Sequence, residues 1–296
     1  MIEKADIHIG LLHRGSEKLI ESKPYLLGMP YFDRFDYIST VAQEHAYCLA
    51  IESLLGTSNY SASYTMLRSM FDELTRVLNH FLAVASHAID IGSMSPMLWA
   101  FEERERILEF FERVSGARMH VALYRPNKAS VEAMSEALIE DIVEFSNNCL
   151  VTLNELHNTL TYNKIWKQRL VNVGSVSYSA CLDYGLTGVM SRSAGLKRDL
   201  RMDSVDTYAN YYHLNFRTYL GQTGDSYDRY LIRMNEMAES LYIATQVAAK
   251  LSDRSEGRVR IAPLRVASFL NKEGLASSLA KHEYASMEKL ITHFKS

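Results

Sequence analysis

The chain has 296 residues, 47% of them hydrophobic and 23% charged, a composition typical of a globular protein that is large enough to bury a substantial core. A net charge of −3 and an isoelectric point near 6.4 argue against binding to nucleic acid, which usually requires a clustered basic face. The apolar runs are too short to cross a membrane, and the first residues lack the pattern of a signal or transit peptide.

The first part of the chain predicts short elements and then a helix. Apolar residues alternate over residues 7–11, which predicts a short strand within a β or loop segment that covers residues 1–15. Ser16 is placed to cap a helix that follows it. Apolar residues then recur at helical spacing over residues 36–55, and Gly56 offers a stop.

Three long helices are predicted in the central part of the chain. One covers residues 64–91 and would be roughly 40 Å long at 1.5 Å per residue, a length that suits the core of a bundle. A second begins at the Ser95–Pro96 pair and ends at Gly116. A third opens at Ser130, and its apolar residues step by three or four along one face: Met134, Leu138, Ile142, Phe145, Cys149, Leu153, Leu156 and Leu160.

The last third is less regular. Residues 172–227 are rich in Gly, Ser, Tyr and Asp and predict loops with short helices, after which another helix begins near Arg229. Residues 252–265 are charged and irregular, and residues 252–284 form a divergent region of the same domain. No internal repeat or low-complexity linker divides the chain, so residues 1–296 are predicted to form a single helical domain.

The three cysteines lie far apart in the sequence, at Cys48, Cys149 and Cys181, and none belongs to a C-x-x-C pair. An odd number of isolated cysteines argues against a disulfide framework and against a thiolate metal site. This pattern fits a reducing compartment.

A polar stripe interrupts the apolar pattern of residues 64–91, formed by Glu73, Arg76, His80 and His87, with Asp90 about a turn beyond. The spacing favours a hydrogen-bonded packing network between helices. Two alternatives stay open: the wall of a buried cavity, and a metal site of two histidines and one carboxylate. The metal site is disfavoured, because the two histidines lie two turns apart.

Two further charged motifs flank the end of the second long helix. The run E-E-R-E-R over residues 102–106 is typical of a solvated helix face. The motif G-A-R-M-H over residues 116–120 follows a helix stop, where Arg118 and His120 could point at a charged or redox group or could simply lie on the surface.

Residues 30–47 group Arg34, Asp36 and Tyr37 at the start of a predicted helix. The Tyr37 phenol could donate a hydrogen bond to a carbonyl oxygen of a ligand. The alternative is a tyrosine that packs into the core with its hydroxyl bonded to the backbone.

A series of motifs along nearly the whole chain resembles the quinone-site subunit of respiratory complex I, the 49-kDa type that is related to the large subunit of nickel–iron hydrogenases. The series consists of I-G-L-L-H-R-G (9–15), F-D-R-F-D-Y (32–37), L-N-H-F-L-A-V-A-S-H-A-I-D-I-G (78–92), W-A-F-E-E-R-E-R (99–106), V-S-G-A-R-M-H (114–120), N-K-I-W-K-Q-R-L-V (163–171), T-G-D-S-Y-D-R-Y (223–230) and S-M-E-K-L-I-T-H-F-K (286–295). The resemblance implies a mainly α fold, a bundle of long helices with minor β structure at the N-terminus.

The resemblance also implies the chemistry and the cofactors. In that family, electrons from NADH pass along iron–sulfur clusters to a last 4Fe–4S cluster, held by a neighbouring subunit, and from there to ubiquinone in a cavity between the two subunits. This chain would therefore bind no cofactor alone and would have ubiquinone as the substrate, while NAD and FMN would bind elsewhere in the complex. The positions of two hydrogenase metal cysteines would fall on Asp36 and Ser39, so no metal and no hydrogenase activity are expected.

Site residues follow from the matched motifs. The head group of the quinone would lie at Tyr37, with Asp90 in its charge network and with Ser86 and His87 lining the cavity. Arg34, His120 and Arg118 would lie near the terminal cluster, where cations raise its potential. Arg14 would be the arginine that some members of the family methylate.

The expected partners are the other subunits of complex I, especially the subunit that holds the terminal cluster and the membrane-arm subunit at the quinone entry. The expected location is the matrix side of the mitochondrial inner membrane, as a peripheral protein, with the cytoplasmic side of a bacterial plasma membrane as the alternative. The subunit would not be active alone.

Two segments of the family pattern find no match in this sequence. They are an N-terminal segment with G-P-Q-H-P-x-x-H-G, whose second histidine is the other head-group ligand, and a C-terminal β segment. The expectation is therefore a split subunit, in which separate polypeptides supply both segments. The alternative is a scaffold or assembly subunit of the same complex without quinone chemistry, and a Tyr37→Phe substitution would distinguish the two.

Overall fold

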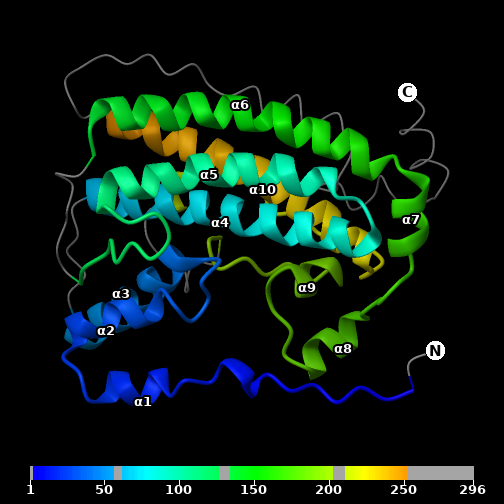
Figure 1. Cartoon of the computed structure of the whole chain (residues 1–296), viewed down its shortest axis with the longest axis horizontal. Coiled ribbons are helices and arrows are strands. Elements are labelled where there is room, and N and C mark those ends of the chain that lie inside the picture. The colour runs from blue at the N-terminus through cyan, green and yellow to red at the C-terminus, as the bar shows by residue number, and fades with distance from the viewer. Residues whose placement is uncertain (1–2, 57–61, 127–133, 203–210, 253–296) are drawn as a thin grey trace.

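The computed structural model describes residues 3–56, 62–126, 134–202 and 211–252, and four long helices dominate these residues. Helix α4 (Ala62–Ile91) lies at the centre and packs against α10 (Ser226–Ser252) and α5 (Ser95–Ser115). Helix α6 (Glu136–Thr161) covers α10 and α5 from the other side (Figure 1). The expected mainly α fold is therefore confirmed.

Shorter elements surround one side of this bundle. Helices α1 (Ser16–Glu21), α2 (Tyr25–Phe32) and α3 (Thr40–Leu55) follow one another beside the N-terminal half of α4. At the opposite end lie α7 (Lys164–Leu170), α8 (Tyr178–Asp183) and α9 (Gly188–Ser193), and a 3-10 turn, η3 (Tyr211–His213), precedes α10 (Figure 1).

The long helices follow from local signals in the sequence. In α6 the Ser135 hydroxyl accepts the Leu138 amide, and the predicted apolar face is buried from Leu138 to Leu160. Helix α4 ends before Gly92, which adopts a φ of 115°, and α5 ends before Gly116, with a φ of 81°. Glycine reaches such positive φ values without steric cost, so both predicted stops are confirmed.

The predicted strand at residues 7–11 is wrong. These residues are irregular and run into a 3-10 turn, η1 (Gly10–Leu12), and their side chains are exposed. An isolated strand has no hydrogen-bond partner, and no described segment extends alongside this one to form a ladder. Helix α1 begins at Ser16 itself, because Gly15 takes the capping position in a left-handed conformation.

Several boundaries also differ from the prediction. Helix α3 begins at Thr40 rather than residue 36, because residues 33–39 form a turn, and α2 was not predicted. The predicted cap at Ser95 is replaced by Met94, which has no side-chain cap bond. Ser130 and residues 253–284 lie outside the described residues.

The three cysteines Cys48, Cys149 and Cys181 are free thiols and are all buried. Among the described residues, no helix combines the length and the apolar character needed to cross a bilayer.

Candidate functional site

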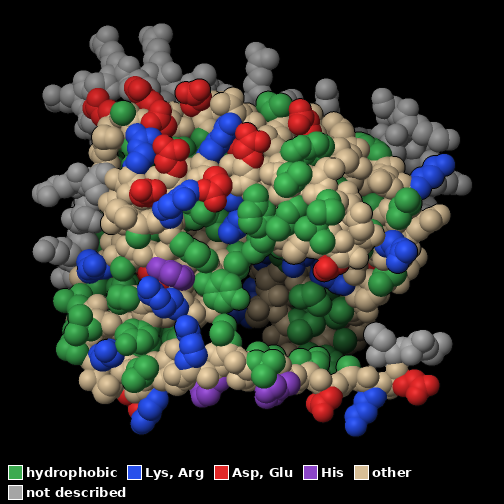
Figure 2. Space-filling model, viewed as in Figure 1, with side chains coloured by type: hydrophobic (Ala, Val, Ile, Leu, Met, Phe, Trp, Pro, Cys, Tyr) green, Lys and Arg blue, Asp and Glu red, His purple; other side chains and the backbone are tan. Residues whose placement is uncertain are grey.

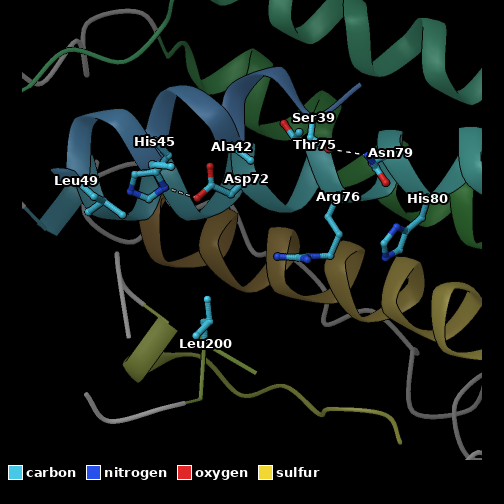
Figure 3. A pocket seen from close by; sticks show the side chains of 11 residues that line it. Ser39, Ala42, His45, Leu49, Asp72, Thr75, Arg76, Asn79, His80 and Leu200 are labelled. Atoms are coloured by element: carbon cyan, nitrogen blue, oxygen red, sulfur yellow. Dashed lines mark hydrogen bonds and ion pairs between the residues drawn. The ribbon is translucent and has the colours of Figure 1, made fainter. Parts of the chain in front are cut away.

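The loop of residues 33–39, between α2 and α3, exposes Tyr37. Asp36 shapes this loop: its carboxylate accepts the amide two residues further on at 3.2 Å, and its carbonyl accepts the Ser39 amide at 3.1 Å. The Ser39 hydroxyl accepts a 2.6 Å hydrogen bond from Asn79 of α4 (Figure 3). Because 46% of the Tyr37 surface is exposed, the alternative of a tyrosine packed into the core is wrong, and the phenol is accessible to a ligand.

The face of α4 that anchors this loop also carries Ser86 and Asp90. Asn79, Ser86 and Asp90 are seven and four residues apart, which places them on one side of the helix. At 1.5 Å per residue, Ser86 lies roughly 10 Å and Asp90 roughly 16 Å further along the axis than Asn79. Ser86 and Asp90 are both exposed. The Tyr37 loop and Asp90 therefore mark the two ends of one exposed helix face.

A hollow is visible on the face of the molecule that Figure 2 shows. Figure 2 shows that the surface is recessed below the long helices, between them and the N-terminal segment that leads into α1. In the same view of the ribbon, the α9 region borders this recess (Figure 1).

His87 lies on a neighbouring side of α4. Its ring is half-buried and packs against Trp166 of α7, with 5.0 Å between the ring centroids. Burial lowers the pKa of His87, Arg233 of α10 lowers it further, and Asp90 opposes this change. The structure thus brings His87 to α7 and α10, with Asp90 within electrostatic reach, and not to the Tyr37 loop.

Arg34 of the same loop lies beside Arg14 and within electrostatic reach of His120. Arg14 and Arg34 line a small cavity of about 150 Å³ between the N-terminal segment and the loop. The Arg34 guanidinium donates a 2.5 Å hydrogen bond to the Pro30 carbonyl. Burial lowers the pKa of the half-buried His120 and the charge of Arg34 lowers it further, whereas Asp33 opposes the change.

Arg118 lies apart from this group. Its side chain is exposed and forms ion pairs with Glu105 and, at 3.7 Å, with Glu112, both on α5. Neither of these two ion pairs connects Arg118 to Arg34 or His120. Its assignment to the neighbourhood of an iron–sulfur cluster stays a prediction.

The expectation of a solvated face at residues 102–106 is wrong for two of them. Glu103 is buried and accepts a 2.8 Å hydrogen bond from Thr152 of α6, and the buried Arg104 donates to the Leu78 carbonyl of α4. These two residues join α5 to its neighbours. The pattern of charged residues in the sequence could not show that Glu103 and Arg104 are buried while their neighbours are exposed.

The polar stripe of α4 forms a packing network in the core. Glu73 is fully buried and accepts hydrogen bonds from Tyr211 and Ser240, both at 2.6 Å, and from Arg201 at 3.1 Å. Burial opposes ionisation of Glu73, but Arg201, Arg76 and the two hydroxyl donors outweigh it and lower its pKa to about 2. Glu73 is therefore a buried carboxylate with a full set of donors.

His80 extends this network toward α9. It lies 2.8 Å from Glu236 of α10, which also accepts a 2.5 Å hydrogen bond from Arg192 of α9. Burial lowers the pKa of His80 more than Glu236 raises it, so a neutral imidazole donates its N–H to the carboxylate. Among the described residues, no group of three metal-capable side chains could hold an ion. The contacts support the packing network that the spacing favoured.

A cavity of about 460 Å³ lies between α3 and α4 behind the Tyr37 loop (Figure 3). Ser39 and Asn79 line one part of it, and a buried pair of His45 and Asp72, 2.5 Å apart, lines another. The remaining lining residues are Ala42, Ala46, Leu49, Thr75, Arg76, His80 and Leu200. The cavity is therefore lined both by the anchor of the Tyr37 loop and by residues of the core network.

Sequence reasoning missed several buried polar residues. His45, Asp72, Glu236 and Arg201 were not singled out, although each is buried and paired. The available signal was a polar residue at a position where the helical period predicts a core side chain, as at Asp72 in α4.

The chain matches the model of the family described as respiratory-chain NADH dehydrogenase, 49 Kd subunit, over residues 90–296. It is 65% identical to the NADH-ubiquinone oxidoreductase 49 kDa subunit of Paramecium tetraurelia over the whole of this chain and 73% of that protein. It is 46% identical to the protein of the same name from Pylaiella littoralis, again over the whole of this chain and 70% of the relative.

A bacterial relative shows the same extent of similarity. It is a subunit of the NADH-quinone oxidoreductase of Rickettsia typhi, which is 45% identical over the whole of this chain and 72% of its own length. The similarity therefore covers every element described above. The chain belongs to the family of the 49 kDa subunit of respiratory complex I, the NADH:ubiquinone oxidoreductase.

Proposed function

We propose that this subunit forms one wall of the ubiquinone cavity of complex I and lies beside the terminal 4Fe–4S cluster that a neighbouring subunit holds. The observation that carries the proposal is the exposed Tyr37 loop, which is anchored through Ser39 to the α4 face that bears Ser86 and Asp90. The relatives are named as oxidoreductases of NADH and ubiquinone, so a redox-active quinone is the substrate that this exposed phenol would meet.

The arrangement supports this chemistry by position and charge. Reduction of a quinone places negative charge on its carbonyl oxygens, which a phenol donor such as Tyr37 stabilises. Asp90, at the far end of the same face, belongs to a charge network with His87 and Arg233 that can hold or release a proton. Ser86 lies on α4 between Asn79, which anchors the Tyr37 loop, and Asp90, and we propose that it lines the wall of the quinone cavity.

The cluster side of the proposal rests on Arg34 and His120. Arg34 belongs to the Tyr37 loop and lies within electrostatic reach of His120, so an electron donor docked against these two residues would lie close to the quinone. A cation at this position stabilises the reduced cluster and raises its potential. The neighbouring subunit with the cluster and the membrane-arm subunit at the quinone entry are the proposed partners.

Two further parts of the proposal come from the family resemblance. A histidine from another segment of the family pattern is proposed as the second head-group ligand opposite Tyr37 and Asp90. The proposed location is the matrix side of the mitochondrial inner membrane.

A Tyr37→Phe substitution in the assembled complex tests the quinone role. Loss of a hydrogen bond to a developing negative charge costs about 1.5–3 kcal/mol, so kcat/KM for quinone should fall roughly ten- to hundredfold. Reduction of an artificial acceptor that takes electrons upstream of the quinone should not change. Tyr212→Phe is the matched control, because Tyr212 is 77% exposed and lies in η3, outside the site. An unchanged quinone reductase activity in Tyr37→Phe would refute the proposal and favour the scaffold alternative.

A further inference from the structure

Two acidic side chains, Asp33 and Glu44, lie buried against each other behind the Arg34–Tyr37 loop. Both are 0% exposed. Asp33 Oδ2 accepts the Ala122 amide at 3.0 Å, and Glu44 Oε2 accepts the Tyr124 amide at 2.9 Å. The other two oxygens, Oδ1 of Asp33 and Oε1 of Glu44, are buried and receive no donor from any other described group.

Two carboxyl groups that face each other in a buried site disfavour each other's negative charge, so one of them takes up a proton. Burial raises the pKa of Glu44 to about 10, and the hydrogen bond and charge of Asp33 contribute to the increase. The nearest cation along the chain, Arg34, does not offset this, because its guanidinium turns outward to the Pro30 carbonyl. Two groups sense the charge of Glu44: the Cys48 thiol of α3, whose pKa burial raises to about 12, and the buried Tyr124 phenol. Both also sense the cation Arg68 of α4, and Cys48 senses Arg125.

The segment that these carboxyl groups hold is strained. Ala122 adopts a φ of 43°, in the left-handed region where a residue with a Cβ is disfavoured by roughly 1–2 kcal/mol. Such a conformation persists where its surroundings determine it. Here the Ala122 amide is held by Asp33, and the Ala122 carbonyl accepts a 2.5 Å hydrogen bond from Arg125.

The clamp acts on His120 through this backbone. His120 lies two residues before Ala122, and its ring senses both Asp33 and Arg34 electrostatically. Asp33 itself is the residue before Arg34. The same buried carboxyl pair is therefore tied to Arg34 through the chain and to His120 through the clamped segment.

We propose that Asp33 and Glu44 share one proton and form a clamp that sets the position of His120 relative to Arg34. The two acids are positioning residues, since neither reaches the surface. The clamp itself is independent of the proposed function, whereas its effect on the cluster rests on the placement of His120 and Arg34 beside that cluster.

The test compares two substitutions of Glu44 in the assembled complex. Glu44→Gln keeps an acceptor for the Tyr124 amide and a donor for Asp33, and Glu44→Leu keeps neither. Hydrogen exchange of the Ala122 and Tyr124 amides should become at least about tenfold faster in Glu44→Leu and stay near the parent rate in Glu44→Gln. Equal protection in Glu44→Leu and the parent would overturn the clamp.

If Glu44→Leu fails to assemble, the shape-conserving pair Glu44→Gln and Asp33→Asn decides the question. Each replaces one acid by a permanent donor, so each should keep the two amides protected. The infrared band of a buried protonated carboxylic acid should disappear in Glu44→Gln, where the amide donates to Asp33 in place of the shared proton. Persistence of that band in Glu44→Gln would overturn the shared proton.

A second readout separates the clamp from the proposed function. Displacement of His120 and Arg34 in Glu44→Leu should shift the midpoint potential of the terminal cluster to lower values and alter its pH dependence, and Glu44→Gln should restore both. Faster exchange with an unchanged cluster potential would uphold the clamp and contradict the placement of His120 beside the cluster.

Discussion

Replacement of Glu73 by glutamine tests how strongly the buried network of α4 stabilises the bundle. Glu73 accepts donors from Arg201, Tyr211 and Ser240, which come from three separate parts of the chain. Its pKa falls from 4.5 to about 2, which at 1.36 kcal/mol per unit corresponds to about 3 kcal/mol of stability. Removal of one partner from a buried ion pair typically costs a similar amount, because the remaining charge is left uncompensated.

The sign of the pH dependence follows from the direction of the shift. Because the pKa of Glu73 is lower in the folded state, its contribution is fully present above the ordinary value of 4.5 and is lost as the pH falls through about 2. At neutral pH the whole contribution is therefore available to be removed by Glu73→Gln.

Native-state hydrogen exchange of the α4 and α10 amides in the assembled complex measures this loss. A decrease of about 3 kcal/mol in the free energy of local opening should accelerate exchange roughly hundredfold. Glu102→Gln is the control, because Glu102 is exposed on α5 and its ion pair with Arg106, at 3.5 Å, is exposed as well. The effect of Glu102→Gln should therefore stay within about 0.5 kcal/mol. Similar exchange rates in the two variants would refute the reasoning.

Three smaller predictions follow from the clamp and from the surface. Because the folded-state pKa of Glu44 is raised, its contribution to the stability of the folded state is greatest below pH 4.5 and declines toward pH 10. Hydrogen exchange of the clamped amides, corrected for intrinsic rates, should therefore accelerate from pH 6 to 9 in the parent and stay flat in Glu44→Gln. Ala122→Gly should leave the stability of the complex unchanged or raise it by about 1 kcal/mol, because glycine tolerates the positive φ of this position. Ala88→Gly in α4 should instead cost about 1 kcal/mol or more, and an equal loss of stability in the two variants would contradict the backbone strain at Ala122. Arg118→Ala should change stability by less than about 1 kcal/mol, because its ion pairs with α5 are exposed, and a larger loss in thermal unfolding would show that it has a further partner.

The long helices could be predicted because their signals are local. The apolar face of α6 repeats every three or four residues from Leu138 to Leu160, and positive-φ glycines stop α4 and α5 at Gly92 and Gly116. The strand at residues 7–11 could not be judged in this way. Alternation shows that a strand is compatible with the sequence, but only a neighbouring strand makes it form.

The partners of buried polar residues could not be predicted, because they lie far away in the sequence. His80 pairs with Glu236 across 156 positions, and Glu73 pairs with Ser240 across 167. Helical periodicity shows that such residues share a stripe, but the stripe does not show which element packs over it. The spacing therefore favoured a packing network correctly without identifying α9 and α10 as its other side.

The loop of residues 33–39 shows why only the exposed residues of the site could be predicted from the sequence. Motif matching drew attention to Arg34, Asp36 and Tyr37, which face outward, and it passed over Asp33. Yet an exposed loop holds a defined shape only if something inside fixes it, and Asp33 is the one of these residues whose side chain is fully enclosed. Because its carboxyl group must share its site with a second acid, Glu44, the position of the outward-facing residues depends on a proton that no surface motif reveals.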